Sequence, residues 1–190
     1  MTTQTIKVWD PMVRIFHWSL ASLFLFSYIT EDDFMDLHVI AGYLVTGLVV
    51  FRLLWGVIGT KHARFSDFVK TPTEVKAYIK DVVLFRAKRY LGHNPAGGMM
   101  VIALILSIII TSLTGMLVYG AEESAGPLLS WVNNVSHGTA DFFEETHEFF
   151  ANFTLFLVVF HVGGVIITSL QHRENLVRSM INGYKHNKVT

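Results

Sequence analysis

The sequence contains no cysteine among its 190 residues. This absence excludes disulfides, thiolate zinc sites, iron–sulfur ligation and the covalent attachment of a c-type haem. Any metal must therefore be held by histidine or by oxygen ligands, and nine histidines are present. Charge is also scarce, because charged residues make up 16% of the chain against 52% hydrophobic residues, which is too apolar for an ordinary soluble domain. The composition predicts a membrane protein.

Four stretches that are almost free of charge are long enough to cross a bilayer core of about 30 Å as helices. Asp10 is a good N-cap for the first of them, and Pro11 is a good first helical residue. Because this first stretch lacks a basic leader and a small-residue cleavage site, we interpret it as a membrane anchor rather than a signal peptide. We therefore expect an all-α integral membrane four-helix bundle that forms one domain over residues 1–190, with spans at about 11–30, 37–58, 98–120 and 147–170.

The charges are sorted along the chain, although fifteen Lys+Arg balance fifteen Asp+Glu. Residues 1–14, the stretch 52–97 and the tail from Gln171 hold every Lys and Arg. The segments between them hold ten carboxylates and no base, namely Glu31, Asp32, Asp33, Asp36, Glu122, Glu123, Asp141, Glu144, Glu145 and Glu148. The positive-inside rule then predicts cytoplasmic termini, a cytoplasmic loop 59–97 and a periplasmic loop 121–146 in a bacterial inner membrane. The zero net charge provides no basic field for nucleic acid, so we expect no nucleic-acid partner.

Several polar and aromatic residues are expected at the membrane edge. The segment Thr73–Lys88 is typical of a short amphipathic helix that lies along anionic membrane lipid. Arg52 stands near enough to one end of the second span for its side chain to snorkel toward water. Five histidines fall in loops or in the tail, where solvated surface is the expected setting: His62, His93, His137, His172 and His186. The tryptophans near span ends, Trp9, Trp18, Trp55 and Trp131, are typical of an interfacial belt.

The other four histidines, His17, His38, His147 and His161, lie in or at the edges of the spans. A histidine in a membrane helix is costly enough to indicate a functional site. His147 and His161 are fourteen residues apart, so they share one helix face to within about 40° and are separated by roughly 21 Å along the axis. His17 begins the first span from the inside, and His38 opens the second from the outside. Each of two depths therefore has two imidazoles.

These pairs, His38 with His147 and His17 with His161, match what two six-coordinate haems need, and without cysteine the haems would be of the b type. Glycines leave room for a macrocycle between helices, although close helix packing explains any single one equally well: Gly42, Gly47, Gly115, Gly163 and Gly164. Two other interpretations of the histidines remain open from spacing alone. They are interfacial polar residues bonded to their neighbours, or part of a metal or proton pathway.

A set of ordered motifs resembles the bacterial cytochrome b561 group, which includes the b-type cytochrome subunits of membrane nickel–iron hydrogenases. The motifs are Trp9-Asp10-Pro11, Arg14–Trp18, Leu37–Tyr43, Arg52–Gly56, Ala63-Arg64-Phe65, Gly92–Gly98, Thr114-Gly115, His147-Glu148 and His161. The resemblance covers essentially the whole chain. It implies a four-helix di-haem cytochrome b that passes electrons between a partner and the quinone pool, with His17, His38, His147 and His161 as the iron ligands.

The resemblance and the residues together lead to a set of functional expectations. We expect two haem b groups and a quinone substrate, with Arg14 and Arg52 beside haem propionates and Gly42 and Gly115 beside the macrocycles. No catalytic side chain is expected. The periplasmic partner would be a hydrogenase small subunit or a c-type cytochrome, and the long acidic loop Glu122–Glu148 departs enough from the family pattern that a hydrogenase is not required.

Two alternative functions differ in class. Some cytochromes b561 exchange electrons between superoxide and ubiquinone without a partner, but every formal charge on the outer side here is negative and repels an anion. A haem-free metal or proton transporter would need carboxylates within the spans, which have none. We expect quinone to react on the cytoplasmic side, where hydrogen-bond donors are concentrated: Arg14, Trp18, Arg52, Lys61, His62, Arg64 and His93.

Overall fold

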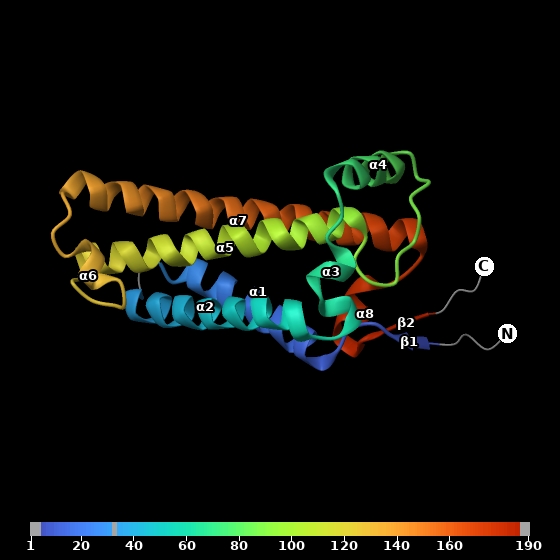
Figure 1. Ribbon diagram of the computed structural model, residues 1–190, viewed down its shortest axis with the longest axis horizontal. Helices are drawn as coiled ribbons and strands as arrows, with labels where there is room; N and C mark the ends of the chain where they lie inside the picture. Colours follow the sequence, from blue (N-terminus) through green and yellow to red (C-terminus); the bar gives the residue numbers. More distant parts are fainter. Residues whose placement is uncertain (1–4, 32–33, 187–190) are drawn as a thin grey trace. The chain divides into compact units, whose positions relative to one another are not determined.

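The structure is a computed structural model that describes residues 5–31 and 34–186. Four long helices dominate it: α1 (Pro11–Ile29), α2 (Met35–Ile58), α5 (Pro95–Glu122) and α7 (His137–His172) (Figure 1). Each is long and apolar enough to cross a membrane, which confirms the expected all-α membrane fold. Two of the ten carboxylates named above, Asp32 and Asp33, and one base of the tail, Lys188, lie outside the described residues.

Two helices are longer than the charge-free stretches from which their spans were predicted. α5 begins at Pro95, and α7 begins at His137, ten residues before the expected edge. The Ser136 hydroxyl caps the start of α7 by accepting from the backbone N–H of Thr139 at 3.3 Å. Glu and Phe are compatible with a helix outside the hydrocarbon, so hydropathy marks only the apolar part of α7 and not its true beginning.

The chain forms two compact units, and each of the four long helices contributes to both. Met1–Ser19, Phe51–Ile102 and Val159–Thr190 form one, and Leu20–Val50 with Ala103–Val158 form the other. All fifteen Lys and Arg belong to the first unit, which we call the basic unit. The second contains ten carboxylates and no Lys or Arg, and we call it the acidic unit. The charge sorting seen along the sequence is therefore also a sorting between units.

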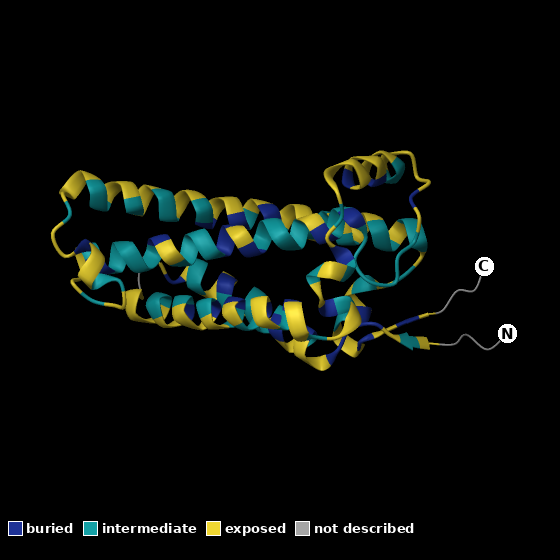
Figure 2. Cartoon of the chain, viewed as in Figure 1, coloured by how far each residue is buried: buried dark blue, intermediate teal, exposed yellow. Residues whose placement is uncertain are grey.

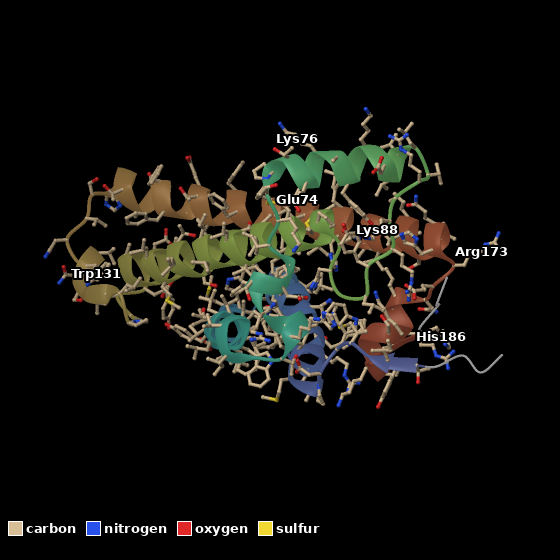
Figure 3. All side chains as sticks on the ribbon, turned by 45° about the vertical axis from the view of Figure 1, so that its right-hand side comes forward. Glu74, Lys76, Lys88, Trp131, Arg173 and His186 are labelled. Atoms are coloured by element: carbon tan, nitrogen blue, oxygen red, sulfur yellow. The ribbon has the colours of Figure 1, made fainter. Side chains whose placement is uncertain are left out.

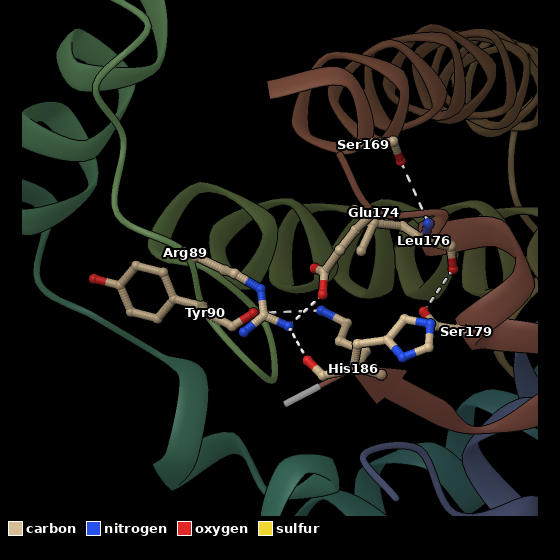
Figure 4. A network of polar contacts seen from close by, with 8 residues as sticks. Arg89, Tyr90, Ser169, Glu174, Leu176, Ser179 and His186 are labelled. Atoms are coloured by element: carbon tan, nitrogen blue, oxygen red, sulfur yellow. Dashed lines mark hydrogen bonds and ion pairs between the residues drawn. The ribbon is translucent and has the colours of Figure 1, made fainter. Parts of the chain in front are cut away.

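The basic unit joins the two ends of the described chain. β1 (Thr5–Lys7) pairs antiparallel with β2 (Tyr184–His186), with Ile6 opposite Lys185 (Figure 1). The helix before β2, α8 (Leu176–Asn182), ends at Gly183, whose φ of 90° favours glycine. Arg89 forms an ion pair with Glu174 and donates to the carbonyl of His186 at 2.7 Å (Figure 4). These contacts fix the connection between α2 and α5, residues 59–94, to the C-terminal segment. We call this connection the middle loop.

Three short helices lie in that middle loop: η1 (Lys61–Ala63), α3 (Phe65–Phe68) and α4 (Pro72–Val83). α4 begins with a capping box between Thr71 and Glu74 and has Pro72 in its first turn. It ends before the expected Lys88, because the chain turns at Phe85, which has a φ of 54°. Lys76 extends away from α4 (Figure 3).

The acidic unit contains the remaining helix, α6 (Leu129–Val132), and polar links between its long helices. The Ser107 and Thr154 hydroxyls lie 2.7 Å apart, which joins α5 to α7, and Thr154 is fully buried. The Tyr28 hydroxyl donates to Asn152 Oδ1 at 2.6 Å and joins α1 to α7. Hydrogen bonds between hydroxyl or amide side chains commonly help apolar helices to associate in lipid.

Many residues along the four long helices are exposed (Figure 2), and large apolar side chains are among them. Of the most apolar 18-residue window in each, only 11–22% is buried within the protein. Large apolar side chains such as Ile58, Val159 and Leu170 are mostly exposed. A soluble monomer rarely exposes so much apolar surface, and a lipid bilayer would cover it.

Asp10 joins the start of α1 to the end of α2 within the basic unit. Its carboxylate accepts from the backbone N–H of Val13 at 3.0 Å, from the Thr60 hydroxyl at 2.6 Å and from Trp55 Nε1 at 3.4 Å. Burial opposes ionisation of this group, but hydrogen bonds led by that from Thr60 outweigh the burial, and the pKa of Asp10 falls below its ordinary 3.8. The expected N-cap is thus present.

We expect Asp10→Ala to lower the free energy of unfolding by about 1–2 kcal/mol, since it removes the cap and leaves buried donors without an acceptor. Asp10→Asn keeps the cap and is expected to cost less. Thermal unfolding in detergent measures both. The folded pKa is depressed, so the charge contributes stability above the ordinary pKa of 3.8, and this contribution is lost as the pH falls through the folded pKa. Equal midpoints for Asp10→Ala and the wild type would contradict this role.

Candidate functional site

The acidic unit brings His38 of α2 and His147 of α7 together, with ring centres 6.0 Å apart and ring planes inclined by 77°. His38 Nδ1 lies 2.8 Å from the carbonyl oxygen of Ser27, and His147 Nδ1 lies 2.8 Å from that of Thr111. A carbonyl oxygen only accepts, so Nδ1 carries the proton of each neutral ring. Each Nε2 therefore retains a lone pair, which is the form in which a metal-binding histidine is usually held.

His38 and His147 line a pocket that is open to solvent in part and is formed only by residues of the acidic unit, including Phe24, Gly42, Tyr43, Gly115 and Tyr119. At Gly42 an added Cβ would meet nothing within 4 Å. At Gly115 an added Cβ would lie 2.7 Å from His147 Cε1. Gly115 is therefore required for the close approach of the His147 ring, and Gly42 leaves open space in the pocket wall.

The basic unit brings His17 of α1 and His161 of α7 together, with ring centres 6.3 Å apart and ring planes inclined by 49°. His17 Nδ1 is buried and has no hydrogen-bond partner among the described residues. The Trp18 ring packs edge-on against His17 at 5.1 Å. One turn or less beyond His161, an added Cβ at Gly163 or Gly164 would meet nothing within 4 Å.

Both separations fit a single metal held between two imidazoles. A ring nitrogen binds a transition metal at about 2 Å and lies roughly 1 Å from its ring centre, so two rings on opposite sides of one metal have centres about 6 Å apart. The observed 6.0 and 6.3 Å agree with this spacing. Each histidine pair can supply two ring nitrogens to a metal. Within residues 5–31 and 34–186, no group of three or more His, Asp or Glu could hold a metal ion. The donor set therefore fits a macrocycle-bound metal better than a bare ion.

The two arginines expected at the cofactors have different surroundings. Arg14 donates through Nη1 to the carbonyl oxygen of Ile181, so it holds α8 to α1. Arg52 is only 3% exposed, and its guanidinium lies over the Phe65 ring at 4.9 Å. The expectation that Arg52 snorkels to water is wrong, because Phe65 and Phe68 of α3 cover the end of its side chain.

The five remaining histidines are not all solvated as expected. His137 and His186 are exposed, but His62, His93 and His172 are half-buried. His62 Nδ1 lies 2.9 Å from Asp67 Oδ2. His93 packs between Trp9 and Phe68, at ring separations of 4.8 and 4.6 Å, and its Nδ1 is buried. The solvated interpretation is wrong for His93, because the middle loop folds back onto the N-terminal segment.

Some contributors to these sites had no signal in the sequence. The carbonyl oxygens of Ser27 and Thr111 orient the rings of His38 and His147, and any residue type provides such an oxygen. Phe68, one of the most deeply buried side chains, lies beside both Arg52 and His93, and its loop position gave no indication of this.

Comparison with known proteins agrees with this geometry. A family model described as prokaryotic cytochrome b561 matches residues 8–183. Proteins named probable Ni/Fe-hydrogenase B-type cytochrome subunit are similar along much of the chain. The one from Cupriavidus necator is 26% identical, with 78% of this chain and 65% of that protein covered, and the one from Rhizobium leguminosarum bv. viciae is 24% identical, with 95% and 88% covered. The one from Azotobacter vinelandii is 26% identical, with 78% and 66% covered.

The alignments thus span slightly less than two thirds of the C. necator and A. vinelandii proteins. No solved structure matches the chain significantly. The family model nevertheless covers nearly all of the described residues, and the four apolar helices agree with it. The chain belongs to the prokaryotic cytochrome b561 family, and it is a multi-pass membrane cytochrome of the b type.

Proposed function

We propose that this chain binds two haem b groups and carries electrons between a periplasmic redox partner and the quinone pool of a bacterial inner membrane. The observation that carries the proposal is the pair of imidazole couples, whose ring centres are 6.0 and 6.3 Å apart. His38 and His147 would hold one haem, and His17 and His161 the other. Haem iron, when bound, supplies reversible one-electron transfer. The protein's part is to fix the axial nitrogens, exclude water and position the partners.

The orientation in the membrane follows from the charges. Every Lys and Arg belongs to the basic unit, and the acidic unit has none. The positive-inside rule supports a cytoplasmic basic unit and a periplasmic end for the acidic unit. Electrons that enter at His38 and His147 would then leave at His17 and His161, on the side from which protons are taken up for quinone reduction.

The periplasmic partner is proposed to dock on the acidic unit. The relatives are named as hydrogenase cytochrome subunits, which supports a hydrogenase small subunit, with a c-type cytochrome as the other candidate. Trp131 and Phe142 are 76% and 62% exposed there, beside acidic residues such as Glu144 and Glu145, and Figure 3 shows Trp131 at the surface. Exposed aromatic residues among charges are typical of a docking surface. The same carboxylates repel superoxide, which disfavours the stand-alone alternative.

Quinone is proposed to react beside His17 and His161 in the basic unit. A quinone oxygen needs a hydrogen-bond donor, and a proton is needed at each oxygen during reduction. His62 is half-buried, and its Nδ1 is paired with Asp67 at 2.9 Å. A carboxylate held against one imidazole nitrogen orients the other nitrogen and supports proton exchange through it. We therefore assign His62 to the proton supply of the quinone.

Anionic lipid is proposed to contact α4 and the turn after it. Val83 and Phe85 are 70% and 79% exposed, and Lys76 and Lys80 are exposed on the same short helix. Apolar side chains next to bases favour the inner leaflet, where apolar groups enter the acyl boundary and bases meet the head groups.

The first prediction from this function concerns cofactor content. The purified protein is expected to contain two haems per chain, measured as the pyridine haemochrome against protein concentration. Because the chain has no cysteine, acidified organic solvent is expected to release all of the haem. One haem per chain, or haem retained on the polypeptide, would be inconsistent with the proposal.

The second prediction separates the two haems. His147→Ala is expected to remove or alter the haem of the acidic unit, and His161→Ala that of the basic unit, each with partial retention of the other. His137→Ala, an exposed histidine at the start of α7, is the matched control and is expected to leave both unchanged. Redox titration followed by low-temperature spectra measures each haem. An unaltered spectrum in both ligand variants would refute the assignment.

The third prediction concerns quinone. His62→Gln is expected to slow oxidation of the haem at His17 and His161 by a soluble quinone, without slowing its reduction from the periplasmic side. His186→Gln, an exposed histidine of the same unit, is the control. Stopped-flow absorbance of the reduced protein measures the oxidation. If a quinone-site inhibitor perturbs only the haem at His38 and His147, the quinone site lies on the other side of the membrane.

A further inference from the structure

Arg52 is a buried cation whose hydrogen bonds are incomplete. The residue is 3% exposed, and its Nη1 is buried and has no hydrogen-bond partner among the residues that the structure describes. Its guanidinium lies over the Phe65 ring at 4.9 Å, the Phe68 ring at 5.9 Å and the Phe16 ring at 6.0 Å. Aromatic faces attract a cation but accept no strong hydrogen bond, so they do not replace a carboxylate. An unpaired buried charge is strongly destabilising, which indicates an anionic partner.

The side-chain carboxylate that influences Arg52 electrostatically is already engaged in other hydrogen bonds. Asp10 acts on Arg52 electrostatically. Its oxygens, however, accept from Val13, Thr60 and Trp55. Asp10 therefore partly balances the charge of Arg52 but is committed to the cap of α1. The acceptor for Nη1 has to come from elsewhere.

His93 offers a second donor beside the same aromatic ring. Its ring centre lies 4.6 Å from that of Phe68, which also lies beneath Arg52. His93 Nδ1 is buried and without a hydrogen-bond partner in the described part of the chain. Burial, followed by the positive charges of Arg52 and Lys185, lowers the pKa of His93 to about 3. A neutral donor in a positive local potential is a favourable setting for an anion.

Both donors are next to the histidine pair of the basic unit. Phe16, which Arg52 contacts, directly precedes His17. His161 is close enough to His93 to influence it electrostatically. All of these residues belong to one unit, so their arrangement does not depend on the other.

We propose that Arg52 and His93 form a carboxylate-binding site for a propionate of the haem held by His17 and His161. Arg52 Nη1 and the N–H of His93 donate to the propionate oxygens, and both donors lie beside the Phe68 ring. This inference rests on the proposed function, because it requires a haem at that histidine pair. It assigns to His93 a role that its loop position does not indicate. Arg14 is not part of this proposal, because its Nη1 already donates to the carbonyl oxygen of Ile181.

The test uses the full-length holoprotein with haem labelled by ¹³C at its propionate carboxylates. Redox-induced infrared difference spectra report those carboxylates directly, independently of activity. Arg52→Gln and His93→Asn are each expected to shift a labelled propionate band of the haem at His17 and His161. Arg178→Gln, an exposed arginine of α8 in the same unit, is the matched control and is expected to leave the bands unchanged. Arg52→Lys keeps the charge but not the planar fork, so an intermediate shift is expected.

The outcomes separate this inference from the function on which it rests. A wild-type chain without two haems would refute the proposed function before the variants are examined. Two haems in every variant, with labelled bands identical to the wild type, would overturn the carboxylate site alone. If Arg52→Gln does not retain the haem, the test rests on Arg52→Lys and His93→Asn. Unchanged propionate bands in both of these variants would likewise overturn the proposed carboxylate site.

Discussion

Water is absent from the core of a bilayer, so every polar group placed there needs a partner within the protein. This constraint governs the acidic unit. Ser107 bonds to Thr154, and Tyr28 bonds to Asn152, so hydroxyl and amide groups hold apolar helices together. His38 and His147 satisfy one ring nitrogen each with a backbone carbonyl oxygen. The other nitrogen of each ring is left for a ligand, and the same bonds that stabilise the helices thus also prepare the site.

In the basic unit, loop segments cover the polar groups, and some of these groups, such as Arg52 Nη1, have no hydrogen-bond partner among the described residues. Arg89 ties the middle loop to Glu174 and to the backbone at His186 (Figure 4). Asp10 ties the start of α1 to Thr60 at the end of α2. These links keep α3 over the end of α2, so Phe65 and Phe68 shield Arg52 from solvent. Arg52, whose side chain was expected to reach water, is therefore a buried hydrogen-bond donor.

The division of charge has a consequence for function. The basic unit contains every Lys and Arg, and the acidic unit contains two thirds of the carboxylates. In the proposed function, the same asymmetry orients the helices in the membrane and provides an acidic surface for a periplasmic partner and donors for a quinone. Under that proposal, the orientation in the membrane and the docking of the partner depend on one pattern of residues.

The sequence by itself determined the four helices, the sorting of charge and the histidines that pair, because hydropathy and helical spacing are local properties. The Asp10 cap and the class of membrane protein also followed from it. Only the tertiary structure decided the burial of Arg52 and His93, since that depends on a loop folding back over residues distant in the sequence. It alone also decided which carbonyl oxygens accept hydrogen bonds from the histidine rings. Every residue carries a carbonyl, so no residue type marks Ser27 and Thr111, and their place beside His38 and His147 exists only once the helices are packed.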